Sequence, residues 1–121
     1  MARNRVAGLI ALKINGDLYK AKGNFTYNLG MPKRDAILGA DRVHGYKEAV
    51  QTPFIEGEIT DTSELSLEAL MMVDDATITL ELGNDKVIVL RQAWQAGEGT
   101  GNTEEGNIAV RFEGMSAEEI R

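Results

Sequence analysis

The stretch that decides the fold is FIEGEIT at residues 54–60, which passes directly into DTSELSLEAL at residues 61–70. In the first segment apolar and polar residues alternate with a period of two, which is typical of a half-buried strand. In the second segment Leu67, Leu70 and Met71 stand at i, i+3 and i+4, which is the spacing of an amphipathic helix. The sequence therefore predicts a strand followed at once by a helix.

We expect the helix region to cover residues 61–73 and the helix to be about ten residues long. Asp61 followed by Glu64 resembles a capping box, and Ser63 is the competing N-cap. A single short helix on a β domain must bury its apolar face. The leucine stripe is therefore assigned to the core rather than to a partner-binding groove.

The rest of the chain has strand periodicity. A long hairpin is predicted over residues 6–29, because two alternating runs flank Asn15-Gly16, a strong tight-turn signal. Its packed faces consist of Val6, Gly8, Ile10, Leu12 and Ile14 on one strand and Tyr19, Ala21, Gly23, Phe25, Tyr27 and Leu29 on the other.

Five further strands are expected, at residues 43–50, 53–60, 76–82, 86–96 and 107–113. We therefore predict a mainly β fold, a β-sandwich or small barrel of about seven strands with one short flanking α-helix.

The segments between and beyond these strands are also predicted. The whole chain, residues 1–121, is expected to be one domain. Residues 1–5 are expected to form a short basic N-terminal arm, residues 97–106 a flexible acidic loop, and residues 115–121 a charged C-terminal tail.

Residues 30–42 are expected to form a long loop, because Gly30, Pro32 and Gly39 interrupt the strand pattern. Loops of this length in a compact domain usually have a function. Exposed Ile37 and Leu38 within it would require a partner.

Composition limits the classes of function. The net charge is −6, which disfavours a tight nucleic-acid binder that neutralises phosphates. There is no cysteine, so disulfides and cysteine-based metal sites are excluded. No secretory signal and no membrane span are expected.

The carboxylates of Glu56 and Glu58 were weighed as an acid–base pair. Alternate strand residues lie about 6.6–6.8 Å apart, but any strand with two acids on one face gives that spacing. The ordinary interpretation is a solvated strand face. An acid–base enzyme at this pair is one hypothesis, and a monomeric β-barrel module that binds a sugar or other ligand near Trp94 and Tyr46 is another.

The remaining motifs carry little chemistry. His44 is the only histidine and has no partner for a typical zinc set. GEGTGNTEEG at residues 97–106 lacks the Lys-Ser/Thr of a phosphate-binding loop. Asp74-Asp75 lacks the spacing of a calcium loop. No catalytic residue, metal or cofactor is therefore predicted.

The chain resembles the tail tube proteins of Mu-like contractile-tailed bacteriophages and related prophages. The resemblance covers nearly the whole sequence and depends on the order and spacing of its motifs. These motifs are NRVAG at residues 4–8, FIEGEITD at 54–61, the leucine-rich helix, ATITLEL at 76–82, VLRQAW at 89–94, and EEG with VRFEG at 104–114.

The resemblance implies a non-enzymatic structural protein without cofactors, built as stacked hexameric rings. Such rings form a rigid tube inside a contractile sheath, and the fold is shared with the inner tube of type VI secretion systems. The implied partners are other copies of the chain, the tail sheath protein, and the baseplate and tail terminator proteins. DNA would pass through an acidic bore without tight binding, and no membrane would be involved. The implied location is the virion tail, assembled in the cytoplasm of the host bacterium.

Under this resemblance, polar strand faces become candidates for the bore. They are Glu56, Glu58, Thr60, Thr77, Thr79 and Glu81. Residues on the arm and loops become candidates for contacts within and between rings. They are Arg3, Arg5, Lys33, Arg34, Ile37, Leu38, Glu98 and Thr100. Lys20 and Lys22 fit an acidic bore poorly and are expected to pair with carboxylates or to face outward.

Overall fold

The computed structural model describes residues 10–63 and 65–121. The predicted N-terminal arm, with Arg3 and Arg5, lies outside the described residues, as do Val6 and Gly8.

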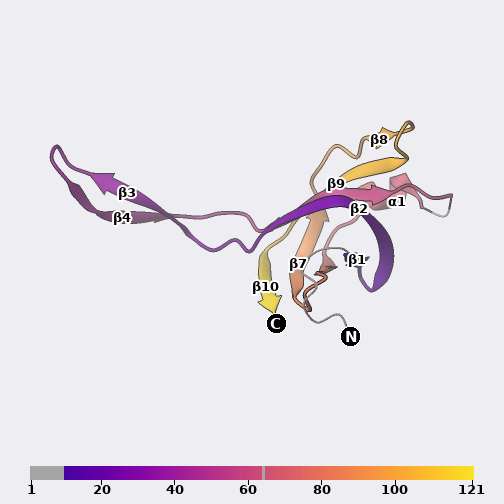
Figure 1. The fold of residues 1–121 in the computed structure, drawn as a ribbon, viewed down its shortest axis with the longest axis horizontal. Helices are drawn as coiled ribbons and strands as arrows, with labels where there is room; N and C mark the ends of the chain where they lie inside the picture. The colour runs from indigo at the N-terminus through magenta and orange to yellow at the C-terminus, as the bar shows by residue number, and fades with distance from the viewer. Residues whose placement is uncertain (1–9, 64) are drawn as a thin grey trace.

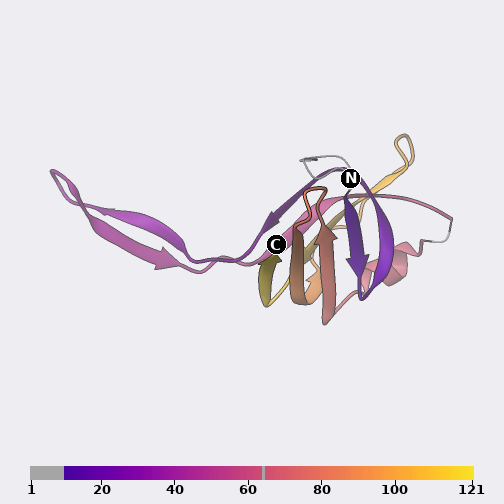
Figure 2. The same cartoon turned by 60° about the horizontal axis from the view of Figure 1, so that its bottom comes forward.

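Six antiparallel strands close into a barrel (Figures 1 and 2). Their order is β7-β6-β1-β2-β5-β9, and β9 pairs back onto β7 to complete the ring. The strands are β1 (Ala11–Ile14), β2 (Asp17–Asn28), β5 (Phe54–Thr60), β6 (Ala76–Glu81), β7 (Val87–Gln95) and β9 (Asn107–Glu113). The predicted mainly β fold with a small barrel is confirmed.

Strand β2 turns one corner of the barrel. Its first residues, 17–20, pair with β1, and residues 21–28 pair with β5. The pairing of β2 with β5 shifts register between Lys22 and Thr26. Such irregularities bend a strand and increase its twist, so one strand can serve two differently oriented sheets.

The opposite corner lies where β7 meets β9. Only Trp94 and Gln95 of β7 pair with β9, while the first half of β7 pairs with β6. Gln92 has a φ of 51° at this point and marks a break in the ladder.

The barrel interior is filled by one residue in two from each strand, as the alternation predicts. The core consists of Leu12, Ile14, Ile55, Ile59, Leu70, Ala76, Ile78, Leu80, Ile88, Leu90, Ala93, Ile108, Val110 and Phe112. Burial of this apolar surface is the main favourable term in folding.

The predicted hairpin at the N-terminal side is confirmed from Ile10 onward. Asn15 and Gly16 have φ values of 52° and 90°, which the Asn-Gly turn tolerates well. The Asn15 side chain also accepts a hydrogen bond from the backbone N–H of Thr77, at 2.9 Å. The turn is thereby attached to β6.

The helix is shorter than predicted and begins later. Helix α1 covers only Leu67–Met71, and its N-cap is Ser66, whose Oγ accepts from the N–H of Ala69 at 3.1 Å. The expected caps at Asp61 and Ser63 are therefore wrong. The reason is packing: Leu70 is the one residue of α1 that is buried, so a single turn is enough to place it in the barrel.

Residues 30–42 are not a plain loop. Strand β3 (Lys33–Leu38) pairs with β4 (Val43–Ala49), and the two form a hairpin that extends far from the barrel (Figure 1). The turn is confined to residues 39–42. The missed strand lacks the alternation that a core imposes, because its residues face no core.

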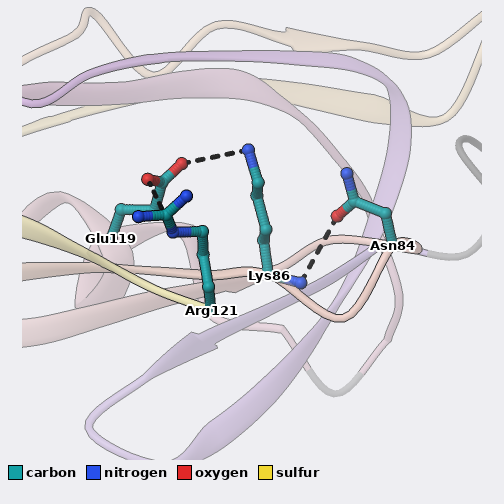
Figure 3. Close-up of polar contacts among 4 residues, drawn as sticks. All are labelled: Asn84, Lys86, Glu119 and Arg121. Atoms are coloured by element: carbon teal, nitrogen blue, oxygen red, sulfur yellow. Dashed lines mark hydrogen bonds and ion pairs between the residues drawn. The ribbon is translucent and has the colours of Figure 1, made fainter.

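The C-terminal segment is likewise not a free tail. Strand β10 (Ser116–Ile120) pairs with the first half of β7. Charged side chains stabilise this position: Lys86, beside the β6–β7 turn, lies 3.2 Å from Glu119, which also contacts Arg121 (Figure 3). Charged residues are common on edge strands, where they discourage wrong pairing.

The acidic segment at residues 97–106 includes β8 (Gly101–Asn102), which pairs with the start of β9. Residues 10–63 and 65–121 thus hold ten strands, and β3, β8 and β10 are the three beyond the expected seven. Within the described residues, no helix is long and apolar enough to cross a membrane.

Candidate assembly surfaces

The outer face of β5 presents Glu56 and Glu58, with Thr60 half-buried beside them. The register places Glu56 opposite Arg111 of β9, and their side chains form an ion pair at 3.4 Å. Arg111 also contacts Glu113 at 3.0 Å, so one guanidinium bridges two carboxylates. We name the outer side of β5 and β9 the β5 face.

Glu58 is held differently from Glu56. Asn107, the buried polar residue of β9, donates from Nδ2 to the Glu58 carboxylate at 2.9 Å. Each carboxylate therefore has a partner of its own on β9. The two do not converge on a common point, which is what an acid–base pair would require.

The other candidates for chemistry lie elsewhere. His44 is on β4, in the projecting hairpin, and its ring packs against Gly39. Among residues 10–63 and 65–121, no three His, Asp or Glu side chains are grouped as metal ligands. What the β5 face offers is a charged, solvated wall.

Thr77, Thr79 and Glu81 lie on the outer side of β6, and their alternate neighbours point into the core. In the closed order, β6 is three strands from β5 in either direction, so the two polar faces lie on opposite sides of the barrel. The structure therefore does not bring the two sets of predicted bore residues together. We name the outer side of β6, β1 and β7 the β6 face.

The two faces differ in charge. On the β6 face, Lys13 pairs with Glu81 at 2.9 Å, and Arg91 pairs with Glu118 of β10. On this face each of these cations is paired with one carboxylate. On the β5 face, Arg111 pairs with Glu56 and Glu113, and Glu58 adds a third carboxylate.

Lys22 of β2 lies beside the β5 face, opposite Glu58 in the register, and is a second cation next to Arg111. Its ammonium group donates to the backbone carbonyl of Glu105, so it fastens the acidic loop to β2. Lys20, nearer the β2 start, is exposed and lies opposite Ala11 on the other sheet. Lys22 therefore holds the acidic loop against β2, and Lys20 faces solvent.

Glu98 and Thr100 line a hollow of about 210 Å³ together with Glu56 and Arg111. The segment that carries them follows the edge of β9, where Ala109 donates to the carbonyl of Thr100 at 3.2 Å. These two predicted contact residues therefore adjoin the β5 face and add Glu98 to its carboxylates.

The hairpin carries the other predicted contact residues that the structure describes. Lys33, Arg34, Ile37 and Leu38 are all exposed on β3. Arg34 lies over the ring of Tyr46, 4.9 Å from its centroid, and Lys33 pairs with Asp35 at 3.6 Å.

The ligand-binding alternative required a pocket near Trp94 and Tyr46. Trp94 lies on β7 at the barrel corner, whereas Tyr46 lies on the hairpin. These two aromatic residues do not form a common platform, and neither lines the hollows described here at β1–β2, at β2–α1 and beside Glu56.

Sequence reasoning missed Arg111 and Asn107 as partners of the two glutamates. Arg111 alternates with buried residues of β9, so its outward direction was readable, whereas Asn107 is itself buried. Their pairing with glutamates of β5 could not be predicted from the sequence, because it depends on the strand register.

Comparisons with known proteins were made on the whole chain. The family model described as phage tail tube protein matches residues 3–119. Among solved structures, one from an extracellular contractile injection system, the PVC sheath/tube terminator in its extended state, superposes with a TM-score of 0.63 at 10% identity, over 93% of each chain.

A second solved structure, the tube-terminating cap of the anti-feeding prophage, gives a TM-score of 0.61 at 9% identity. It covers 92% of this chain and 87% of the other. At such identities the likeness shows the fold alone. A comparison with curated proteins finds no match.

Proposed function

The chain belongs to the phage tail tube protein family, and from that membership we propose that it is the structural subunit of a contractile tail tube. Its copies form hexameric rings, and the rings stack into a tube whose bore conducts the phage genome during ejection. The protein acts as one domain, without catalysis and without a cofactor.

The observation that carries this proposal is the β3–β4 hairpin. Every residue of its two strands except Asp35 is exposed. A two-stranded hairpin in water is marginal by itself. Its exposed apolar residues are therefore expected to be covered in an assembly, as the predicted ring-to-ring contact of Ile37 and Leu38 requires.

We assign the bore to the β5 face rather than to the β6 face. A wall with excess carboxylates repels phosphate at short range, and salt screens this repulsion beyond about 8–10 Å. A wall with excess cations would retain DNA through counterion release. Glu56, Glu58 and Thr60 are then bore residues, and Thr77, Thr79 and Glu81 belong to the outer wall.

The partners follow from the tube. The outer wall meets the tail sheath protein, and the two tube ends meet the baseplate and the tail terminator protein. Two solved structures with a similar fold, a sheath/tube terminator and a tube-terminating cap, support this choice of neighbours. The assembled protein is located in the virion tail, built in the cytoplasm of the bacterial host.

Electron microscopy of the purified chain at rising concentration tests the proposal. We expect six-fold rings and stacked tubes with a central channel. A chain that remains monomeric at high concentration, with no ring in virion or lysate preparations, would reject it. Rings of another symmetry would reject the hexamer but keep the tube.

A further inference from the structure

The turn between β1 and β2 carries an asparagine directly before a glycine. Asn15 is the only asparagine of the sequence that is followed by glycine. Both Asn15 and Gly16 are exposed, and a Cβ atom built on Gly16 would meet no atom within 4 Å. Because glycine has no side chain, its backbone nitrogen is open to a close approach. The turn therefore places an uncrowded amide nitrogen and water next to the Asn15 side chain.

The reaction that such a pair undergoes is deamidation. The backbone nitrogen of Gly16 forms a bond to Cγ of Asn15, the bond from Cγ to Nδ2 breaks, and the proton of the Gly16 amide leaves with Nδ2 as ammonia. The five-membered imide that results then takes up one water molecule. Opening at one carbonyl yields aspartate at position 15. Opening at the other yields isoaspartate, in which the main chain runs through Cγ, so water is the one co-reactant.

The fold opposes this reaction with two hydrogen bonds to β6. Oδ1 of Asn15 accepts from the backbone N–H of Thr77 at 2.9 Å. The backbone N–H of Asn15 donates to the carbonyl oxygen of Thr77 at 2.8 Å. We name these two bonds the Asn15–Thr77 clamp. While the clamp is closed, the side-chain amide is not free to rotate toward the Gly16 nitrogen.

We propose that Asn15 is a deamidation site that is gated by the Asn15–Thr77 clamp. The reaction is suppressed in the folded subunit and proceeds when the β1–β2 turn opens from β6, since local opening exposes groups that the native state holds. One hydrogen bond of ordinary strength lowers the open population roughly two- to tenfold, and two bonds lower it roughly five- to hundredfold. Isoaspartate at position 15 then marks chains that have spent time with this turn open.

The two products have different effects because β1 lies between β2 and β6. Ile14 is opposite Asp17 on β2 and opposite Ile78 on β6. Isoaspartate adds one methylene to the main chain and moves the free carboxylate onto Cα, so a two-residue turn cannot keep this register. Aspartate retains an oxygen at the position that accepts from Thr77. We therefore expect aspartate to preserve the fold and isoaspartate to displace β1, which carries Leu12 and Ile14 of the core.

Peptide mapping by mass spectrometry tests the inference on the full chain. Folded protein is incubated at mildly alkaline pH, and the fractions of asparagine, aspartate and isoaspartate at position 15 are followed with time. The reference is a synthetic peptide of residues 11–20 in the same buffer, which contains the Asn-Gly pair and both arms of the turn but no β6. We expect the folded chain to react about tenfold or more slowly than the peptide.

Two substitutions at Thr77 separate the clamp from folding in general. Thr77→Pro removes the N–H that Oδ1 of Asn15 accepts. Thr77 lies where the pairing of β6 with β7 shifts register, and proline is tolerated at such a position. Thr77→Ala also removes the threonine side chain but keeps the N–H. We expect deamidation to be roughly two- to tenfold faster in Thr77→Pro than in the natural chain, and unchanged in Thr77→Ala.

Three outcomes would overturn the inference. They are equal rates in the folded chain and the peptide, a faster rate in the folded chain, and equal rates in the two Thr77 variants once urea unfolding has verified that both fold. None of these measurements requires a ring or a tube, so a failure here leaves the proposed function in place.

If Thr77→Pro does not fold, hydrogen exchange of the natural chain takes its place. The amides of Asn15 and Thr77 are expected to exchange slowly, and low urea concentrations should speed their exchange and the deamidation in the same proportion. Rapid exchange of both amides together with slow deamidation would show that the clamp does not control the reaction.

Discussion

Gly57 faces into the barrel opposite the ring of Phe25, at the point where β2 shifts register against β5. A Cβ atom at Gly57 would lie 2.5 Å from Cγ of Phe25, closer than real Cβ contacts. The glycine therefore makes room for an aromatic ring at the barrel corner. The alternation of FIEGEIT places Gly57 inward but does not reveal what it accommodates.

We expect Gly57→Ala to reduce the free energy of unfolding by about 1–3 kcal/mol, because the Phe25 ring must move in a packed core. Gly101→Ala is the matched control: its Cβ would meet only Cγ1 of Ile108, at 4.0 Å. Urea unfolding of the dissociated subunit measures both. Equal urea midpoints for the two variants would show that the Phe25 side chain moves without a loss of stability.

At the scale of elements, α1 depends on one side chain. A five-residue helix has little stability of its own, so tertiary packing must hold it. Leu70 is only 2% exposed and packs with the core, whereas Met72, just beyond the helix, points to solvent. The short helix therefore contributes one buried side chain, Leu70, to the barrel core.

Leu70→Ala is accordingly expected to cost about 2–5 kcal/mol in unfolding free energy, through lost burial and a residual cavity. Met72→Ala, the neighbouring control, is expected to change it by less than about 0.5 kcal/mol. Thermal and urea unfolding of the subunit provide the comparison. Similar losses in both variants would mean that α1 is held by its surface and not by Leu70.

The elements also show what the sequence could and could not predict. The hairpin at Asn15-Gly16 and the inward residues of β5, β6 and β9 were readable, since a core imposes alternation on a strand. Strand β3 was missed because it packs on no core of its own chain, and β10 because Ala117 alone of its residues packs against the core. Strand β10 is defined by pairing with β7 and by ion pairs such as Arg91–Glu118, which depend on a register that local patterns do not encode.

The candidate surfaces were predictable to the same extent. Outward polar residues could be identified strand by strand from their period of two. Glu56 and Thr79 lie on opposite sides of the closed barrel. This follows only from the strand order, which is a property of the whole fold. Residue patterns therefore supplied the candidates, and topology separated them into two walls.

For the whole molecule, this separation makes the bore assignment testable by charge. Replacing Glu56 and Glu58 with lysine in every subunit would turn an acidic wall into a basic one. We expect tubes of this variant to retain short DNA duplexes at low salt and to release them as salt rises, because retention arises from counterion release. Retained DNA should resist nuclease, since the tube wall would exclude the enzyme.

The control places two lysines on the other wall, with Thr77→Lys and Thr79→Lys. These tubes are also expected to bind DNA, but on their outer surface, where nuclease digests it. Microscopy of both variants first verifies that tubes form. Protection in the Thr77/Thr79 variant, with digestion in the Glu56/Glu58 variant, would place the β6 face in the bore. The Glu56/Glu58 variant gains four positive charges per subunit and the Thr77/Thr79 variant gains two, so the amounts of DNA bound are not compared. Nuclease protection reports only where the DNA is held, and that depends on which of the two strand faces lies inward.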